Sequence, residues 1–176
     1  MNGGDILMEK WDVYDESGNL AGYTKTQNDV WTSEEYHLGA SLWIINYAGD
    51  LLIQKRAASK RRFPNVWCNI GGSVISGENS RQGCVREVEE EVGIKVNGND
   101  LVFLQRAVFK NTISDDYVLI YDFPIEKVVV QPEEVSEVKW ASIDEIKNLF
   151  TQGLFMINEL ADIEKVIEYI SENIRT

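Results

Sequence analysis

The segment from Gly71 to Ile94 constrains the fold most, because a glycine-rich turn leads directly into a helix that carries three glutamates on one face. Glu87, Glu90 and Glu91 stand at positions i, i+3 and i+4, so their side chains project from the same side of that helix. Like charges at this spacing destabilise an isolated helix by roughly 0.2–0.5 kcal/mol per pair. A hard divalent cation such as Mg²⁺ accepts carboxylate oxygens and offsets this repulsion. The segment therefore predicts either a cation site or a strongly hydrated acidic surface.

The whole chain is acidic, which keeps the second interpretation open and also limits the expected partners. It has 176 residues with 17 basic and 29 acidic side chains, which gives a formal net charge of −12. Such a field repels phosphate backbones and anionic lipid, so neither nucleic acid nor a membrane is an expected partner. An anionic substrate then needs a local basic patch or a metal ion. The length fits a single domain, residues 1–176.

The cysteines and the apolar pattern indicate a compartment. Cys68 and Cys84 form no CxxC pair, so the sequence predicts neither a disulfide framework nor a thiolate zinc site. The N-terminus lacks the basic and apolar regions of a signal peptide, and no apolar run approaches the roughly 20 residues that span a bilayer. We expect a cytoplasmic protein in a reducing environment.

Turn-forming residues and apolar periodicity divide the chain into short strands and a few helices. The helix at 81–92 follows Asn79 and Ser80, either of which can cap it, and it ends at Gly93. Ser142 opens a capping box before a second short helix. The other expected elements are hairpins at 11–24 and 38–54, strands at 101–109, 117–123 and 135–140, and a last helix at 156–174. This mixture predicts an α+β fold with an N-terminal hairpin extension at 1–34 and C-terminal helices at 142–176.

The complete pattern around the glutamates resembles the signature of the Nudix family at every specified position. The matching residues are Gly72, Glu78, Arg86, Glu87, Val88, Glu90, Glu91, Gly93 and Ile94. The resemblance implies a loop–helix–loop motif at 72–94 on a mixed β-sheet sandwiched between helices. It also implies Mg²⁺, with Mn²⁺ able to substitute, and hydrolysis of a diphosphate bond that links a nucleoside or another alcohol to a further group X.

Roles for individual residues follow from this resemblance, position by position. Glu90 and Glu91 match metal ligands, and Glu87 matches a metal ligand or the base that deprotonates the attacking water. The carbonyl group of Gly72 matches a further metal contact, and Arg86 matches the residue that orients the glutamates. The family often adds an acidic residue from outside the motif, and the sequence leaves five candidates open: Asp115, Asp116, Glu133, Glu134 and Glu137.

A basic loop precedes the motif, with five of the 17 basic residues between Lys55 and Arg62. By composition alone, this loop is either a handle for an anionic substrate or a solvated loop that balances acidic neighbours. Residues 37–94 resemble the isopentenyl-diphosphate isomerase branch of the same superfamily. In that branch the residues matching Arg56 and Lys60 contact the substrate diphosphate, and we expect the same role here.

The isomerase reaction itself does not follow from the resemblance. That branch places a catalytic cysteine where this chain has Gly71, and it uses several histidines where this chain has only His37, with Ser73 at a second ligand position. The hydrolase motif, in contrast, is complete. The sequence therefore predicts a Mg²⁺-dependent pyrophosphohydrolase of a small phosphorylated substrate. The alternatives are an isomerase-like enzyme and a non-catalytic module that binds a phosphorylated metabolite. The N-terminal hairpin either covers the site or forms a homodimer interface.

Overall fold

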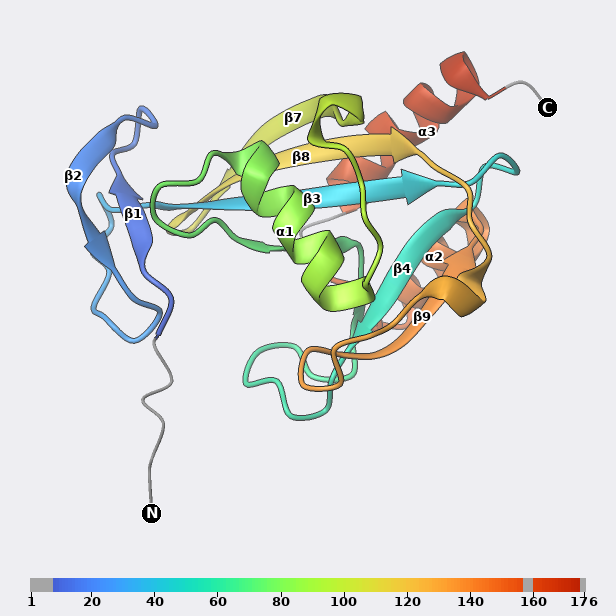
Figure 1. The fold of residues 1–176 in the computed structure, drawn as a ribbon, viewed down its shortest axis with the longest axis horizontal. Coiled ribbons are helices and arrows are strands. Elements are labelled where there is room, and N and C mark those ends of the chain that lie inside the picture. The colour runs from blue at the N-terminus through green and yellow to red at the C-terminus, as the bar shows by residue number, and fades with distance from the viewer. Residues whose placement is uncertain (1–7, 157–159, 175–176) are drawn as a thin grey trace.

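A seven-stranded mixed sheet forms the centre of the protein in the computed structural model, which describes residues 8–156 and 160–174 (Figure 1). Its strands are β3 (His37–Ile45), β4 (Leu51–Arg56), β5 (Trp67–Cys68), β6 (Ile70–Ser73), β7 (Val102–Phe109), β8 (Thr112–Ile120) and β9 (Val135–Ala141). The main path runs β5-β4-β3-β8-β7, while β6 pairs with β3 and β9 pairs with β4. Strands β3 and β8 pair in parallel, and the other pairs are antiparallel.

Helices cover both faces of this sheet. Helix α1 (Ser80–Val92) lies in front of the sheet in Figure 1, while α2 (Ile143–Thr151) and α3 (Leu160–Asn173) lie behind it. Two short 3₁₀ turns, Gly98–Asp100 and Ile125–Lys127, complete the described elements. None of the described helices is long and apolar enough to cross a membrane.

The alternating direction of successive side chains along β3 explains why one hydrophobic core lies on each face of the sheet. Leu42 and Ile44 are fully buried and belong to the cluster that includes Cys84, Val88 and Val92 of α1. Their strand neighbours, Trp43 and Ile45, belong to the other cluster, whose helical members are Ile146, Ile163 and Val166 of α2 and α3. Successive side chains of a strand point to opposite faces, so one apolar strand supplies both layers. The predicted α+β sandwich is therefore confirmed.

The motif helix begins and ends at specific caps. The side chain of Asn79 accepts a hydrogen bond from the backbone of Gln82, whose side chain accepts one from the backbone of Asn79, so these two residues form a capping box. Gly93 ends the helix in the left-handed conformation at φ 68°, as predicted. Of the two predicted caps, the structure selects Asn79, and Ser80 becomes the first helical residue.

Two expected boundaries were wrong. Strand β8 begins at Thr112 rather than Tyr117, because Asp115 and Asp116 lie within the strand and find partners there. The expected glycine-rich turn is in part a strand, because Gly71 and Gly72 pair with Ser41 and Ala40 of β3. The predicted last helix is confirmed over the described residues of α3, while positions 157–159 of that prediction lie outside the described residues.

The N-terminal hairpin, β1 (Trp11–Tyr14) and β2 (Leu20–Lys25), is a separate two-stranded sheet beside the main one, shown in blue in Figure 1. Tyr14 joins it to the domain through two backbone hydrogen bonds with Tyr36, of 2.8 and 2.9 Å. The ring of Trp11 stacks on His37, with 4.6 Å between ring centroids. The hairpin is thus packed against the start of β3.

Candidate active site

Strand β6 and helix α1 bring Gly72 and Glu87 of the motif into contact. A β-carbon placed on Gly72 would lie 2.4 Å from Cδ of Glu87 and 2.5–2.6 Å from its two carboxylate oxygens. Only a residue without a side chain leaves this much room, so the carboxyl group of Glu87 rests against the backbone of the strand. The pairing of β6 with β3 fixes that backbone in place.

Arg86 gathers three glutamates around one guanidinium group. Its Nε donates to both oxygens of Glu78 at 3.1 and 3.2 Å, and its Nη1 donates to Glu87 at 2.8 Å and to Glu90 at 2.9 Å. Nη2 donates to the carbonyl oxygen of Ser73 at 2.9 Å and to Glu78 at 3.2 Å. The planar guanidinium suits such multiple contacts with carboxylates. Arg86 thus contacts two of the motif glutamates, Glu87 and Glu90, together with Glu78, while its orienting role stays a prediction.

Glu91 lies on the same helix but deeper, with only 4% of its surface exposed. Its Oε2 accepts a hydrogen bond from Nε2 of Gln54 at 2.7 Å and a longer one from the backbone N–H of Gly71 at 3.3 Å. The other amide atom of Gln54, Oε1, is buried without a hydrogen-bond partner among the described residues. Gln54 was not predicted as a site residue, and its only sequence signal is a polar side chain inside the apolar run of β4.

Burial raises the pKa of two of these carboxyl groups. The pKa of Glu87 rises to about 7, mainly through desolvation, although the Arg86 guanidinium opposes this shift. The pKa of Glu91 rises to about 8, again mainly through desolvation, with a further contribution from the charge of Glu87. Both shifts mean that the surrounding protein supplies too little positive charge and too few donors for two ionised carboxylates.

This shortage fits a divalent cation. Carboxylate oxygens beside a backbone segment form the hard oxygen donor set that Mg²⁺ and Mn²⁺ accept. In the part of the chain that the structure describes, no three histidine, cysteine or acidic side chains converge into a group that could hold a metal ion, and Glu87 and Glu90 are both paired with Arg86. Binding of one cation by Glu87, Glu90 and Glu91 together would therefore require side chains to move, and Glu90 is the most exposed of the three, with 49% of its side chain accessible.

The basic loop, a name kept here for residues 55–62, lies close to these carboxylates. Its expected start was wrong, because Lys55 and Arg56 are the last two residues of β4, where they pair with β9. Lys60 forms an ion pair with Glu134, and the charge of Glu134 in turn contributes to the raised pKa of Glu91. Lys55 pairs with Glu137 at 2.6 Å. The guanidinium of Arg56 donates to the carbonyl oxygen of Arg62 at 3.3 Å, and within the described residues it has no ion pair with a carboxylate. The charge of Arg56 is therefore available to an anionic ligand.

The five acidic candidates outside the motif occupy different environments. Asp115 forms a two-point ion pair with Arg106 at 2.6 and 2.9 Å, which satisfies its carboxylate. Asp116 accepts hydrogen bonds from Ser41, Ser114 and Gln105 at 2.7–3.1 Å. Of the five candidates, Glu134 is the one whose charge is among the largest contributions to the raised pKa of Glu91.

His37 and Cys84 are packed among other side chains of the domain. Besides stacking on Trp11, the ring of His37 meets the edge of Trp31 at 5.5 Å, and its Nε2 shares a hydrogen bond of 2.9 Å with Thr112. Burial lowers the pKa of this imidazole to about 4, so the ring is neutral near pH 7. Burial also raises the pKa of the Cys84 thiol to about 12, which leaves it unreactive.

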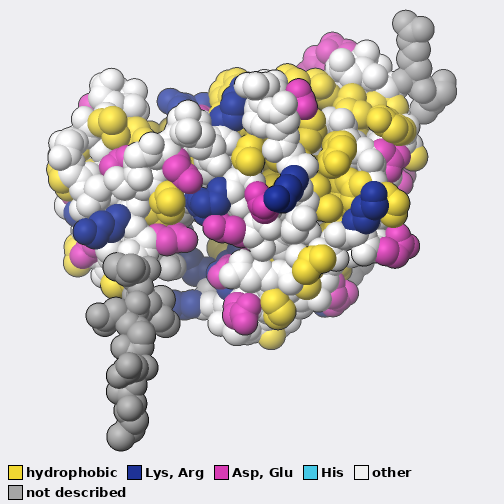
Figure 2. Space-filling view, viewed as in Figure 1, with side chains coloured by type: hydrophobic (Ala, Val, Ile, Leu, Met, Phe, Trp, Pro, Cys, Tyr) yellow, Lys and Arg dark blue, Asp and Glu magenta, His cyan; other side chains and the backbone are white. Residues whose placement is uncertain are grey.

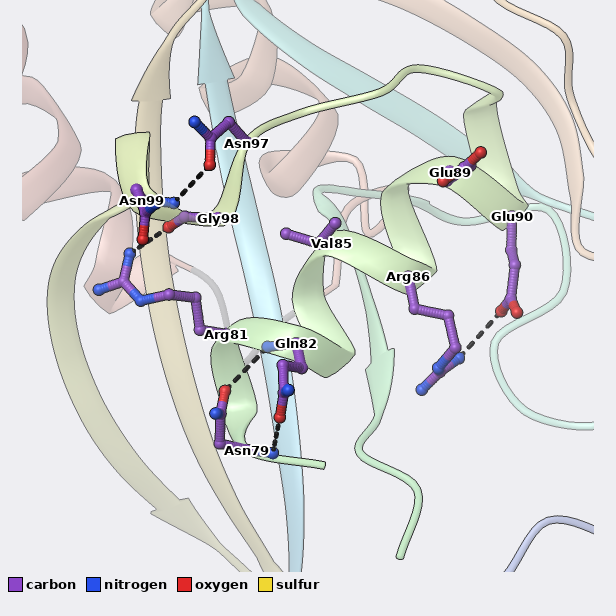
Figure 3. A pocket seen from close by; sticks show the side chains of 10 residues that line it. All are labelled: Asn79, Arg81, Gln82, Val85, Arg86, Glu89, Glu90, Asn97, Gly98 and Asn99. Atoms are coloured by element: carbon purple, nitrogen blue, oxygen red, sulfur yellow. Dashed lines mark hydrogen bonds and ion pairs between the residues drawn. The ribbon is translucent and has the colours of Figure 1, made fainter. Parts of the chain in front are cut away.

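A groove of about 660 Å³, lined mainly by long polar residues, runs along the outer surface of α1, and Figure 3 shows its lining. Arg86 and Glu90 lie at one side of it, while Asn97 and Asn99 lie across the helix. The groove is lined by Glu90 but by neither Glu87 nor Glu91, so it is not the cavity that holds the two buried carboxyl groups. Figure 2 shows a hollow between the hairpin and the rest of the molecule, with basic side chains at its edge.

Comparison with known proteins shows which family and fold this chain resembles. Residues 35–159 match the model of the NUDIX domain family. An uncharacterized Nudix hydrolase of Listeria monocytogenes is 31% identical over 162 residues, which cover 89% of this chain and 96% of that protein. The isopentenyl-diphosphate Delta-isomerase of Citrobacter koseri is 28% identical over 76% of this chain and 77% of its own length. The crystal structure of DR0079 from Deinococcus radiodurans superposes with a TM-score of 0.72 at 22% identity, covering 88% of this chain and 96% of that chain.

The chain therefore belongs to the Nudix hydrolase family. The predicted class of enzyme, a Nudix pyrophosphohydrolase, and the resemblance to the isomerase branch are both confirmed. The superposition, at its low identity, confirms the Nudix fold.

Proposed function

We propose that this protein is a divalent-metal-dependent hydrolase that cleaves a diphosphate linkage in a nucleoside diphosphate-X or a related organic pyrophosphate. The observation that carries the proposal is the pair of buried carboxyls, Glu87 and Glu91, whose pKa values are raised because the protein leaves their charge uncompensated. A bound Mg²⁺ or Mn²⁺ would neutralise phosphate oxygens and lower the pKa of the attacking water.

The motif residues on α1 have different proposed roles in catalysis. Glu90 and Glu91, with the backbone of Gly72, are the proposed metal ligands, and Glu87 is either a further ligand or the base that takes a proton from the water. A carboxyl group with a pKa of about 7 in the metal-free protein is suited to accept that proton near neutral pH. Arg86 holds Glu87 and Glu90 on one side of the helix through a single nitrogen. Water must attack in line, so this orientation contributes directly to rate.

The basic loop is the proposed binding site for the substrate diphosphate. Arg56 offers an uncompensated guanidinium, which binds phosphate oxygens at two points. Lys60 is paired with Glu134, so its contact with a phosphate requires exchange of that partner. Glu134 is our choice among the five acidic candidates for the additional residue, because its charge already acts on Glu91. The proposed location is the cytoplasm, where two buried free thiols are stable.

The backbone argues against the isomerase alternative. A β-carbon on Gly71, where the isomerase branch has its cysteine, would lie 2.4 Å from the carbonyl oxygen of Ala40 and 2.7 Å from Cα of Ser41. No side chain fits there without a shift of β3 or β6. The ring of His37 is packed between Trp11 and Trp31, and its Nε2 already shares a hydrogen bond with Thr112.

A substrate screen by mass spectrometry tests the proposal. The purified protein is incubated with Mg²⁺ or Mn²⁺ and a panel of nucleoside triphosphates, dinucleoside polyphosphates, nucleoside diphosphate sugars and isopentenyl diphosphate. Glu91→Gln is the inactive variant, and Glu89→Gln is the matched control, because Glu89 lies on the same helix in an exposed pair with Lys95. We expect cleavage by the wild type and the control only. Isomerised product, or binding without cleavage, would overturn the proposal.

A further inference from the structure

The loop between β6 and α1, residues 74–79, is fixed from outside the motif. This segment, here called the motif loop, contains Gly77, whose backbone has a φ of +88° and which has no side chain to form contacts of its own. It also contains Glu78, which makes three of the contacts to the Arg86 guanidinium. Any movement of the motif loop therefore moves a partner of Arg86.

Three hydrogen bonds connect the motif loop to the N-terminal hairpin. The hydroxyl of Ser76 donates to Oδ1 of Asp12 at 2.7 Å, and the backbone N–H of Gly77 donates to Oδ2 of the same carboxylate at 2.9 Å. The backbone N–H of Ser76 donates to the carbonyl oxygen of Lys10 at 2.7 Å. One carboxylate of the hairpin thus binds two consecutive residues of the motif loop, and hydrogen bonds to a charged acceptor are about twice as strong as neutral ones.

We infer that Asp12 is a positioning residue, which holds the motif loop so that Glu78 and Arg86 present Glu87 and Glu90 in their working arrangement. The path is continuous: Asp12 binds Ser76 and Gly77, Glu78 follows in the chain, and Arg86 joins Glu78 to the two motif glutamates. This role rests on the proposed function, since it concerns the same site.

The hairpin itself does not depend on Asp12. Val13 is buried with 1% of its surface exposed, Tyr14 bonds to Tyr36 through the backbone, and Trp11 stacks on His37. Replacement of Asp12 therefore removes two of the three hydrogen bonds between the hairpin segment and the motif loop, and we expect the hairpin to stay packed on the domain. Positioning and folding can be separated by mutation.

Asp12→Ala tests the inference, with Asp15→Ala as its matched control. Asp15 lies in the same hairpin and loses the same charge, and its carboxylate accepts three hydrogen bonds of 2.9–3.2 Å from Ser17 and Asn19, but none of these reaches the motif loop. We expect Asp12→Ala to lower kcat by about ten-fold to a hundred-fold with KM little changed, because small misplacements of catalytic groups have effects of this size. Asp15→Ala should retain wild-type kcat, and Asp12→Asn should recover part of the loss.

Amide hydrogen exchange provides a readout that does not require turnover. In Asp12→Ala, exchange should accelerate in residues 74–79 while protection of β1 and β3 stays as in the wild type. Unchanged exchange in the motif loop, or faster exchange without a fall in kcat, would overturn the inference. Exchange that accelerates throughout the hairpin would also overturn it, because Asp12 would then be structural only. If the wild type cleaves no diphosphate, the proposed function fails, while Mn²⁺ affinity replaces kcat as the measure of positioning.

Discussion

The carboxyl group of Glu87 occupies the space in which any residue other than glycine at position 72 would place its β-carbon, only 2.4 Å from Cδ. The contact links a strand of the central sheet to the helix that carries the other glutamates. The obstacle is the end of a flexible side chain rather than backbone, so the side chain can move away at small cost in stability. The residue at position 72 therefore determines the position of the Glu87 carboxyl group.

Gly72→Ala should lower activity strongly while it changes the stability of the fold only slightly. We expect turnover to fall about a hundred-fold, because the carboxyl group of Glu87 must leave its place. Gly98→Ala is the control, since its new β-carbon would meet side chains of Arg81 and Val85 at an ordinary 3.5 Å. Steady-state kinetics and thermal melts of both variants check this. A fully active Gly72→Ala would contradict the role given to Glu87.

Glu91→Gln should abolish metal-dependent stabilisation without destabilising the metal-free fold. The amide can keep the hydrogen bond from Gln54, and its NH₂ group can supply a donor to the orphaned Oε1 of that residue. The buried charge disappears, which removes the desolvation cost. Calorimetric titration with Mg²⁺ and melting in a chelator measure the two effects. Glu89→Gln should bind the cation as the wild type does, and equal cation binding by Glu91→Gln would contradict the assignment.

The stability of the metal-free protein should fall as the pH rises. The folded-state pKa values of Glu87 and Glu91, about 7 and about 8, lie above the ordinary value of 4.5. The folded chain therefore binds more protons than the unfolded chain between these limits, and the free energy of unfolding declines through that window. Melts in a chelator at about pH 5 and about pH 8 measure the slope. Mg²⁺ should reduce this dependence of the unfolding free energy on pH. The dependence should also be weaker in Glu91→Gln, and an unchanged dependence in that variant would refute this explanation.

Gly71→Cys should not convert the enzyme into an isomerase. The new side chain would collide with the backbone of Ala40 and Ser41, which cannot move as a flexible side chain can. We expect a loss of about 1–3 kcal/mol in the free energy of unfolding. Urea denaturation measures this loss, and incubation with isopentenyl diphosphate tests for the isomer. A Gly71→Cys variant as stable as the wild type, with a reactive thiol, would contradict the predicted collision with Ala40 and Ser41.

Arg56→Gln should weaken substrate binding more than turnover. Its guanidinium has no carboxylate partner in the described part of the chain, so its removal costs a contact to the diphosphate and disrupts no ion pair. We expect KM to rise about ten-fold with kcat changed by less than about two-fold. Lys95→Gln provides the control, because that side chain is 83% exposed and lies beyond the end of α1. A fall in kcat alone would place Arg56 in a different role.

The sequence predicted the parts of the site that are local in the chain. The spacing of Glu87, Glu90 and Glu91 along one helix defined their shared face, and Gly93 marked the end of that helix. Local patterns are informative here because helical periodicity and capping depend on neighbours within a few residues.

The contacts that join distant segments were not predictable in this way. Gln54 meets Glu91 across 37 positions, and Asp12 meets Gly77 across 65. The start of β8 was wrong for the same reason, because two consecutive aspartates are unfavourable in a strand until Arg106 and Ser41 provide partners. Contacts between such distant residues can be predicted only when the order of the strands in the sheet is known.

The hairpin that carries Asp12 lies outside residues 35–159, the segment that matches the family. A chain trimmed to that segment would keep every residue of the signature and lose the carboxylate that holds Ser76 and Gly77. Two relatives with identical signatures can therefore differ in catalytic efficiency through a module that no signature records. Grafting hairpins between such relatives offers a way to adjust the order of the catalytic loop without altering the motif itself.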